Sequence, residues 1–83
     1  MNAEFTSRFL KDTRQLKGTR KEELEKMVKK VIEKPEIGKP LRYSYRNCHS
    51  VRIGKFRIIY KLERDKIIFI TFEHRGRVYN KER

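Results

Sequence analysis

The C-terminal half of the chain consists of apolar-rich runs separated by short polar links. Three runs rich in Val, Ile, Phe and Tyr lie at residues 48–53, 56–62 and 67–73, and this composition favours β-strands. Gly54-Lys55 separates the first two runs, and residues 63–66 separate the last two. Links this short join antiparallel neighbours, so this half is predicted to form an antiparallel meander.

The N-terminal half has helical spacing instead. Thr6 or Ser7 can cap a first helix, which Gly18 is expected to end. The side chains that recur at helical spacing in this segment are Phe9, Leu10, Thr13 and Leu16.

A second helix is predicted to begin at Thr19, because Thr19 and Glu22 have capping-box spacing. One apolar stripe follows, and Pro35 stops the helix. The stripe comprises Leu24, Met27, Val28, Val31 and Ile32. The two helices are expected to form an antiparallel hairpin, since the link between them is very short.

These elements predict an α+β fold, in which a short N-terminal strand and a helix hairpin pack on one face of a mainly antiparallel, twisted sheet of four to five strands. The additional strands are expected at residues 1–5 and 41–44, the latter between a linker at 35–40 and a turn at 46–47. A chain of 83 residues without internal repeats is too short for two separate cores. Residues 1–83 are therefore predicted to be one domain.

The hairpin links also predict which side chains share a face. If Ile53 lies opposite Phe56, then Arg52 lies directly opposite Arg57. Continuing the same alternation through the second link places Arg57 opposite Phe72. One face of the sheet is then almost entirely apolar and covers the helices, whereas the other face collects Ser50, Arg52, Arg57, Ile59, Lys61, Ile68, Ile70, Phe72 and His74.

Arg52 and Arg57 as cross-strand neighbours repel each other unless an anion lies between them. Each guanidinium presents a planar fork to two oxygens, which suits phosphate. Phe72 would offer a surface on which a base can stack, as in single-stranded RNA recognition. A tail that could fold along the same face follows the last strand and carries His74, Arg75, Arg77 and Tyr79.

The net charge supports a polyanionic partner. The chain has 23 basic and 11 acidic residues, a formal net charge of +12, and so strong a positive field favours binding to a polyanion or to an acidic partner. A Lys/Glu-rich surface of the heat-stable kind would explain the 41% charged content, but it would not explain the imbalance of sign.

The sequence contains few features of other chemistries. Cys48 is the single cysteine, so it cannot form an internal disulfide and is expected to be structural rather than catalytic. With no signal peptide and no apolar run of about 18 residues, the protein is expected to be soluble and cytoplasmic. No metal-ligand spacing, glycine-rich phosphate loop or serine elbow is present, so neither a metal nor a small-molecule cofactor is expected.

RNA carries its own nucleophile, because a 2′-hydroxyl can attack the neighbouring phosphate and release the 5′-oxygen, leaving a 2′,3′-cyclic phosphate. The reaction needs a proton acceptor, cations that stabilise charge on the phosphate, and an acid for the leaving oxygen. Arginines serve the second need, but a guanidinium rarely gives up its proton. His74 and Tyr79 are therefore the candidates for proton transfer.

The segments Arg52-Ile53-Gly54-Lys55-Phe56-Arg57-Ile58-Ile59-Tyr60 and His74-Arg75-Gly76-Arg77-Val78-Tyr79, behind a short strand and two helices, resemble the RelE/ParE superfamily of bacterial and archaeal toxins. The resemblance covers essentially the whole chain. It implies the toxin of a type II toxin–antitoxin pair. For the RelE branch it implies an endoribonuclease that enters the A site of the 30S subunit, beside rRNA, and cleaves mRNA there. It also implies a RelB-like antitoxin that wraps the toxin.

The same resemblance assigns roles to individual residues. It implies catalytic roles for Arg52, Arg57, Arg75 and Tyr79, and the expected substrate contacts are Ser50, Lys55, Phe72, His74 and Arg77. Ser50 stands where some members have another lysine, so the identity of the general base stays open. His74 could be that base or a structural hydrogen-bonding residue.

Two other functions stay open. A ParE-type inhibitor of DNA gyrase shares the fold, although gyrase poisoning does not call for a phosphate-transfer set of residues. A cleavage-deficient RNA-binding member is the other alternative, because Ser50 departs from the fullest catalytic set. In every case the antitoxin is expected to be acidic, since it must neutralise a domain of net charge +12.

Overall fold

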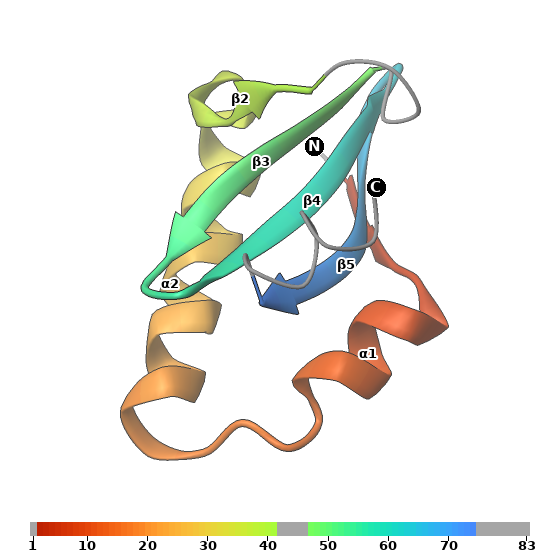
Figure 1. Cartoon of the computed structure of the whole chain (residues 1–83). Coiled ribbons are helices and arrows are strands. Elements are labelled where there is room, and N and C mark those ends of the chain that lie inside the picture. The colour runs from red at the N-terminus through yellow and green to blue at the C-terminus, as the bar shows by residue number, and fades with distance from the viewer. Residues whose placement is uncertain (1, 42–46, 75–83) are drawn as a thin grey trace, which may run out of the picture.

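A five-stranded sheet in the order β1-β5-β4-β3-β2 carries two helices on one face (Figure 1). The computed structural model describes residues 2–41 and 47–74. The elements are β1 (Asn2–Phe5), α1 (Ser7–Thr13), α2 (Gly18–Glu33), a 3-10 helix η1 (Pro35–Ile37), β2 (Lys39–Pro40), β3 (Cys48–Ile53), β4 (Phe56–Glu63) and β5 (Lys66–His74). Neither described helix is long and apolar enough to cross a membrane.

The strands β2 to β5 pair antiparallel in sequence order, and β1 pairs parallel with β5. The predicted α+β architecture is therefore confirmed, including the short first strand and the three long strands of the meander. In Figure 1 the upper part of α2 lies behind β3, and α1 lies below β5; α1 packs on β5 and α2 packs on β3.

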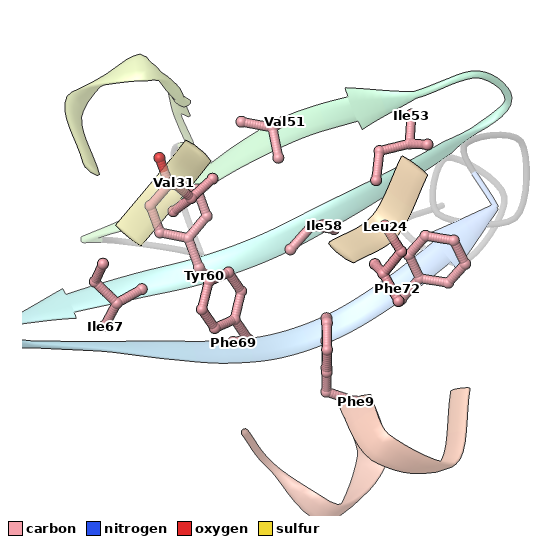
Figure 2. Close-up of a cluster of buried hydrophobic side chains, with 10 residues drawn as sticks. All are labelled: Phe9, Leu24, Val31, Val51, Ile53, Ile58, Tyr60, Ile67, Phe69 and Phe72. Atoms are coloured by element: carbon pink, nitrogen blue, oxygen red, sulfur yellow. The ribbon is translucent and has the colours of Figure 1, made fainter. Parts of the chain in front are cut away.

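Both helices contribute to one core with the inner face of the sheet. Phe9 of α1 contacts the rings of Phe5 and Phe69, at centroid distances of 5.5 and 5.6 Å. Leu24 and Val31 of α2 are buried, as the helical stripe predicts. Figure 2 shows the buried side chains of this core, which are Phe9, Leu24, Val31, Val51, Ile53, Ile58, Tyr60, Ile67, Phe69 and Phe72.

The helix boundaries differ from those predicted. Thr6 does cap α1, since its hydroxyl accepts a 3.0 Å hydrogen bond from the Phe9 amide. However, α1 ends at Thr13, and Gly18 opens α2 instead of closing α1. Gly18 has φ +59, which allows the chain to turn at the start of α2. No side chain caps α2, so the predicted capping box at Thr19 is wrong.

Tyr60 joins the segment after α2 to the sheet. Its hydroxyl donates to the Pro35 carbonyl at 2.6 Å and accepts from the Gly38 amide at 3.0 Å. A Cβ at Gly38 would collide with this hydroxyl, so only glycine fits there. The constraint brings Lys39 and Pro40 beside β3 as strand β2, whereas these residues were predicted to be linker and a strand was predicted at residues 41–44. Leu41 is not in a strand, and residues 42–46 lie outside the described residues.

Candidate functional site

The β3–β4 hairpin has the predicted register. Ile53 lies opposite Phe56, and Arg52 lies opposite Arg57. Gly54 has φ +57 while Lys55 does not have a positive φ, which is the pattern of a type II′ turn. Lys55 is exposed at the tip of this hairpin. The two-residue loop therefore holds two guanidinium-bearing residues side by side on one face of the sheet.

The β4–β5 hairpin departs from the predicted register at a β-bulge. Pairing follows the prediction from Glu63 to Tyr60, but it shifts by one residue between Tyr60 and Ile59, so that Arg57 lies opposite Glu73. The extra residue in β5 is Ile70. Because side chains alternate with a period of two, one inserted residue moves every later side chain of β5 to the other face.

Thr6 satisfies the backbone at this bulge. Its hydroxyl donates a 2.7 Å hydrogen bond to the Ile70 carbonyl, and its amide donates to the Phe69 carbonyl at 3.1 Å. A bulge leaves the ladder locally unpaired, so these two bonds from the start of α1 compensate for the interrupted pairing. No local feature of the β5 sequence predicts a contact with a residue more than 60 positions away.

The predicted placement of Phe72 and His74 beside Arg57 is wrong because of the bulge. Phe72 is only 6% exposed, lies opposite Ile58 in the core, and stacks on Phe56 with the ring centroids 4.9 Å apart. His74 lies opposite Phe56 and meets that ring edge-on at 5.2 Å. Neither ring is placed to contact a ligand held between Arg52 and Arg57.

The side of the sheet away from the helices is called here the outer face, and its residues on β3, β4 and the end of β5 are Cys48, Ser50, Arg52, Arg57, Ile59, Lys61, Thr71 and Glu73. Arg52 is exposed and Arg57 is half-buried. Among the described residues, neither arginine forms an ion pair. The Nε of Arg57 and the hydroxyl of Thr71, which are diagonal neighbours, are buried and have no hydrogen-bond partner among residues 2–41 and 47–74.

The acidic groups near this face contact other cations. The Glu73 carboxylate lies 3.9 Å from Nη2 of Arg8, and the Glu63 carboxylate lies 3.3 Å from Nζ of Lys61. The guanidinium groups of Arg52 and Arg57 are therefore not neutralised from within the described chain. A buried N–H without a partner is costly unless a ligand or water satisfies it, and a phosphate oxygen is a suitable acceptor for Arg57 Nε.

Lys39 is a residue of this face that sequence reasoning missed. It lies directly opposite Ser50 and is exposed, so a cation stands next to the position where Ser50 lacks one. A two-residue strand has no detectable alternation, and the contacts that hold it at the sheet are long-range ones, from Tyr60 to Pro35 and Gly38 and from the Leu41 amide to the Cys48 carbonyl. The sequence therefore offers no local signal for it.

Cys48 is a free, buried thiol on the outer face. Burial raises its pKa, and the neighbouring Lys61 ammonium opposes the shift. A raised pKa disfavours the thiolate, which agrees with a structural rather than a catalytic role. Among residues 2–41 and 47–74, no group of three or more His, Cys, Asp or Glu side chains is arranged to hold a metal ion.

The remaining predicted site residues, Arg75, Arg77 and Tyr79, lie outside the described residues. The structure therefore brings together Arg52 and Arg57, adds Ser50, Lys39 and Thr71 around them, and places Lys55 at the hairpin tip. What this arrangement offers chemically is a pair of cations, neutralised by no carboxylate of the described residues, that can hold one phosphate from two sides.

Comparisons with known proteins agree with this fold. Residues 3–79 match the family described as the ParE toxin of the type II toxin–antitoxin system, parDE. The chain is similar to the isolated RelE toxin of E. coli, with a TM-score of 0.75 and 25% identity, covering 98% of this chain and 93% of that one. No curated protein matches it.

Two further solved structures are similar in fold. One is the RelB–RelE antitoxin–toxin complex from Methanococcus jannaschii, with a TM-score of 0.75, 22% identity, and coverage of 94% of this chain and 96% of that chain. The other is YafQ from E. coli strain BL21(DE3), with a TM-score of 0.77, 17% identity, and coverage of 94% and 97%. Because the family match spans nearly the whole sequence, the chain belongs to this family of type II toxin–antitoxin toxins, within the RelE/ParE superfamily.

Proposed function

We propose that this toxin is a ribosome-dependent endoribonuclease that cleaves mRNA at the A site and so inhibits translation in the cytoplasm. The observation that carries the proposal is the opposed pair Arg52 and Arg57, which no carboxylate of the described chain neutralises. Two guanidinium groups placed side by side on a sheet suit a phosphate, and the proposal takes the scissile phosphate of the mRNA as that group.

In the proposed reaction the 2′-oxygen attacks the adjacent phosphorus while the bond to the 5′-oxygen breaks. The products are a 2′,3′-cyclic phosphate and a 5′-hydroxyl, so no metal-activated water is needed. Arg57 would stabilise the negative charge that builds on the phosphate, with its Nε as one donor. Arg52 would bind the same phosphate from β3 and lie beside the 2′-hydroxyl.

Proton transfer is assigned to the segment after β5. His74 is a poor candidate for the general base, because it lies with Phe56 on the helix-facing side of β5. The proposal therefore gives proton transfer to Tyr79 and a second phosphate-binding role to Arg75, as the resemblance to RelE implies. Ser50, Lys55 and Arg77 remain proposed substrate contacts.

An acidic, RelB-like antitoxin is proposed as the cognate partner. Its charge would complement the net charge of +12. A groove of about 490 Å³ between α2 and the exposed ring of Phe5 is lined by Leu24, Val28 and Ile32, and it would accept apolar side chains of that partner. The RelB–RelE complexes among the similar structures support a partner of this kind.

The experiment is a reconstituted translation assay with purified toxin, followed by mapping of mRNA 3′ ends. Cleavage within A-site codons is expected, with cyclic phosphate termini. Arg57→Ala should reduce the rate by about 100-fold or more, since loss of one transition-state donor costs 100- to 1,000-fold in other enzymes. Arg14→Ala, at an exposed position between the helices, is the matched control. Intact mRNA with the unsubstituted toxin would rule the proposal out.

A second candidate is inhibition of DNA gyrase, which the family description as a ParE toxin favours. A supercoiling assay separates the two functions. Loss of supercoiling at toxin concentrations that leave mRNA intact would favour gyrase inhibition. RNA binding without either activity would identify a cleavage-deficient member. This outcome is included because Ser50 stands where some members have a lysine.

A further inference from the structure

A groove on the flank of α2 opens next to Arg52. It has a volume of about 330 Å³ and lies between α2 and the end of β3. We call it the α2–β3 groove, and the residues that line it are Glu23, Lys26, Met27, Lys30, Arg52, Ile53 and Gly54. It is separate from the apolar groove with Phe5, which lies on the opposite flank of the same helix.

Three of the four charged residues that line the α2–β3 groove are cations. They are Lys26, Lys30 and Arg52, and the one carboxylate among the lining residues is that of Glu23. None of the three cations forms an ion pair with another described residue. Lys26 and Lys30 are four residues apart on α2, a spacing that brings their charges together and slightly destabilises a helix. Both positions are otherwise compatible with the helix, because Glu22 lies four residues before Lys26 and Lys30 lies in the last turn of α2.

Arg52 joins the groove to the outer face. It pairs with Arg57 across the hairpin and also lines the groove. Strand β2 covers β3 only at His49 and Ser50, so the edge of β3 from Val51 onward has no neighbouring strand among the described residues. An extended chain that leaves the outer face over Arg52 can pass this uncovered edge and reach Lys26 and Lys30.

We propose that the α2–β3 groove is a second phosphate-binding site, which holds the backbone of single-stranded RNA next to the phosphate bound by Arg52 and Arg57. Lys26 and Lys30 contact the phosphates in the groove, and Met27 provides an apolar surface between them. The proposal rests on the RNA-directed function proposed above. An acidic peptide is less suited to this groove, because the apolar side chains of a protein partner fit the opposite flank of α2.

The test compares two double variants of the full-length toxin. Lys26→Ala with Lys30→Ala removes two charges in the groove, whereas Lys21→Ala with Lys29→Ala removes two exposed charges of the same helix outside it. Both variants change the net charge equally and place good helix formers on the surface. A long-range effect of net charge is therefore the same for the two variants.

The probe is a single-stranded, 2′-O-methyl RNA of about ten nucleotides, which binds but cannot be cleaved, so the result does not depend on the nuclease activity. The groove variant should bind about tenfold more weakly, and its slope of log K against log salt should fall by about 1.4, since each contacted phosphate of a single strand contributes about 0.7. The control variant should bind within about twofold of the unsubstituted toxin.

Two outcomes would overturn the proposal. Equal losses in both double variants would mean that only net charge matters. A groove variant that binds RNA normally but loses affinity for the acidic antitoxin would assign the groove to the partner protein. Lys26→Arg with Lys30→Arg should retain binding, which separates lost phosphate contacts from a damaged fold.

Discussion

Arg57 and Glu73 are directly opposed in the β4–β5 ladder, yet the Glu73 carboxylate lies 3.9 Å from Nη2 of Arg8 and not within ion-pair distance of Arg57. The β-bulge at Ile70 creates this relationship, because it moves Glu73 onto the face where Phe72 was expected. Glu73 is only 13% exposed. Arg8 of α1 thus competes with Arg57 for a nearby carboxylate, and Arg57 keeps its guanidinium available for an external anion.

Removing Arg8 is expected to impair the site indirectly. In Arg8→Ala, Glu73 can turn toward Arg57 and compete with the RNA phosphate. Affinity for single-stranded RNA should fall about two- to fivefold, since an ion pair with one exposed partner, such as Arg8, is worth about 1 kcal/mol. Fluorescence anisotropy with an uncleavable RNA measures this. Lys11→Ala, another exposed cation of α1, should have less effect.

Rescue identifies the mechanism of the Arg8 effect. Adding Glu73→Gln to Arg8→Ala removes the competing charge and should restore affinity to within about twofold of the unsubstituted toxin. Arg8→Lys should retain most of the affinity. If the double variant binds as weakly as Arg8→Ala alone, then Arg8 contacts RNA itself and the competition described here is wrong.

Lys39 is expected to supply the cation that Ser50 lacks. The two residues are cross-strand neighbours on the outer face, so Lys39→Ala should reduce mRNA cleavage about tenfold, a charge-assisted contact being worth about 1.5 kcal/mol or more. Ser50→Lys in the same background should recover activity. Lys34→Ala, another exposed lysine of this segment, is the control. Full cleavage by Lys39→Ala would show that the neighbouring ammonium has no role.

Tyr60 and Gly38 are expected to be energetically coupled. Tyr60→Phe loses both hydrogen bonds of the hydroxyl, to Pro35 and from Gly38, and should lower the free energy of unfolding by about 1–3 kcal/mol. Gly38→Ala should cost more, because its methyl group collides with that hydroxyl. The cost should be smaller in the Tyr60→Phe background, where the oxygen is absent. Urea unfolding of the four proteins measures the coupling, and additive costs would contradict it.

Stability should fall with rising pH in the alkaline range. Burial raises the pKa of the Cys48 thiol and of the Tyr60 hydroxyl, so both groups release their protons later in the folded chain than in the unfolded chain. The contribution of each group to the free energy of unfolding is fully present below the pKa of that group in the unfolded chain, about 8.5 for cysteine and about 10 for tyrosine. This contribution is lost as the pH rises through the pKa of the group in the folded chain.

The Cys48→Ala variant isolates the first of these steps. Its stability should stay level between about pH 8.5 and 10, where the unsubstituted toxin loses stability. Above about pH 10 both proteins should lose stability, because Tyr60 is unchanged. Urea unfolding at a series of pH values measures both ranges. A parallel decline of the two proteins below pH 10 would show that Cys48 does not titrate as its burial implies.

Much of the fold follows from local pattern. The strand runs, the apolar stripe of α2 and the stop at Pro35 are all visible in the sequence because burial of one face imposes a period of 2 or 3.6 on the apolar positions. Helix boundaries were less predictable. Gly18 is compatible with the end of one helix or the start of another, and only the packing of α1 on β5 and α2 on β3 decides between them.

The sequence by itself determined the pairing of Arg52 with Arg57. A two-residue loop at Gly54-Lys55 permits one register, and the alternation of strand side chains then places both arginines on the same face. The physical reason is that every constraint involved acts between near neighbours in the chain.

Only the tertiary structure decided what surrounds that pair. Thr6, which is far from β5 in the sequence, forms a hydrogen bond with the backbone at the bulge. Because of the bulge, Glu73 and not Phe72 lies opposite Arg57. Lys39 lies on the outer face because Tyr60 holds the segment before it, and Lys26 lines the same groove as Arg52 because α2 packs on β3. These placements depend on the free energy of contacts between residues that are far apart in the sequence, and the hydrophobic pattern of a local segment does not reveal such contacts.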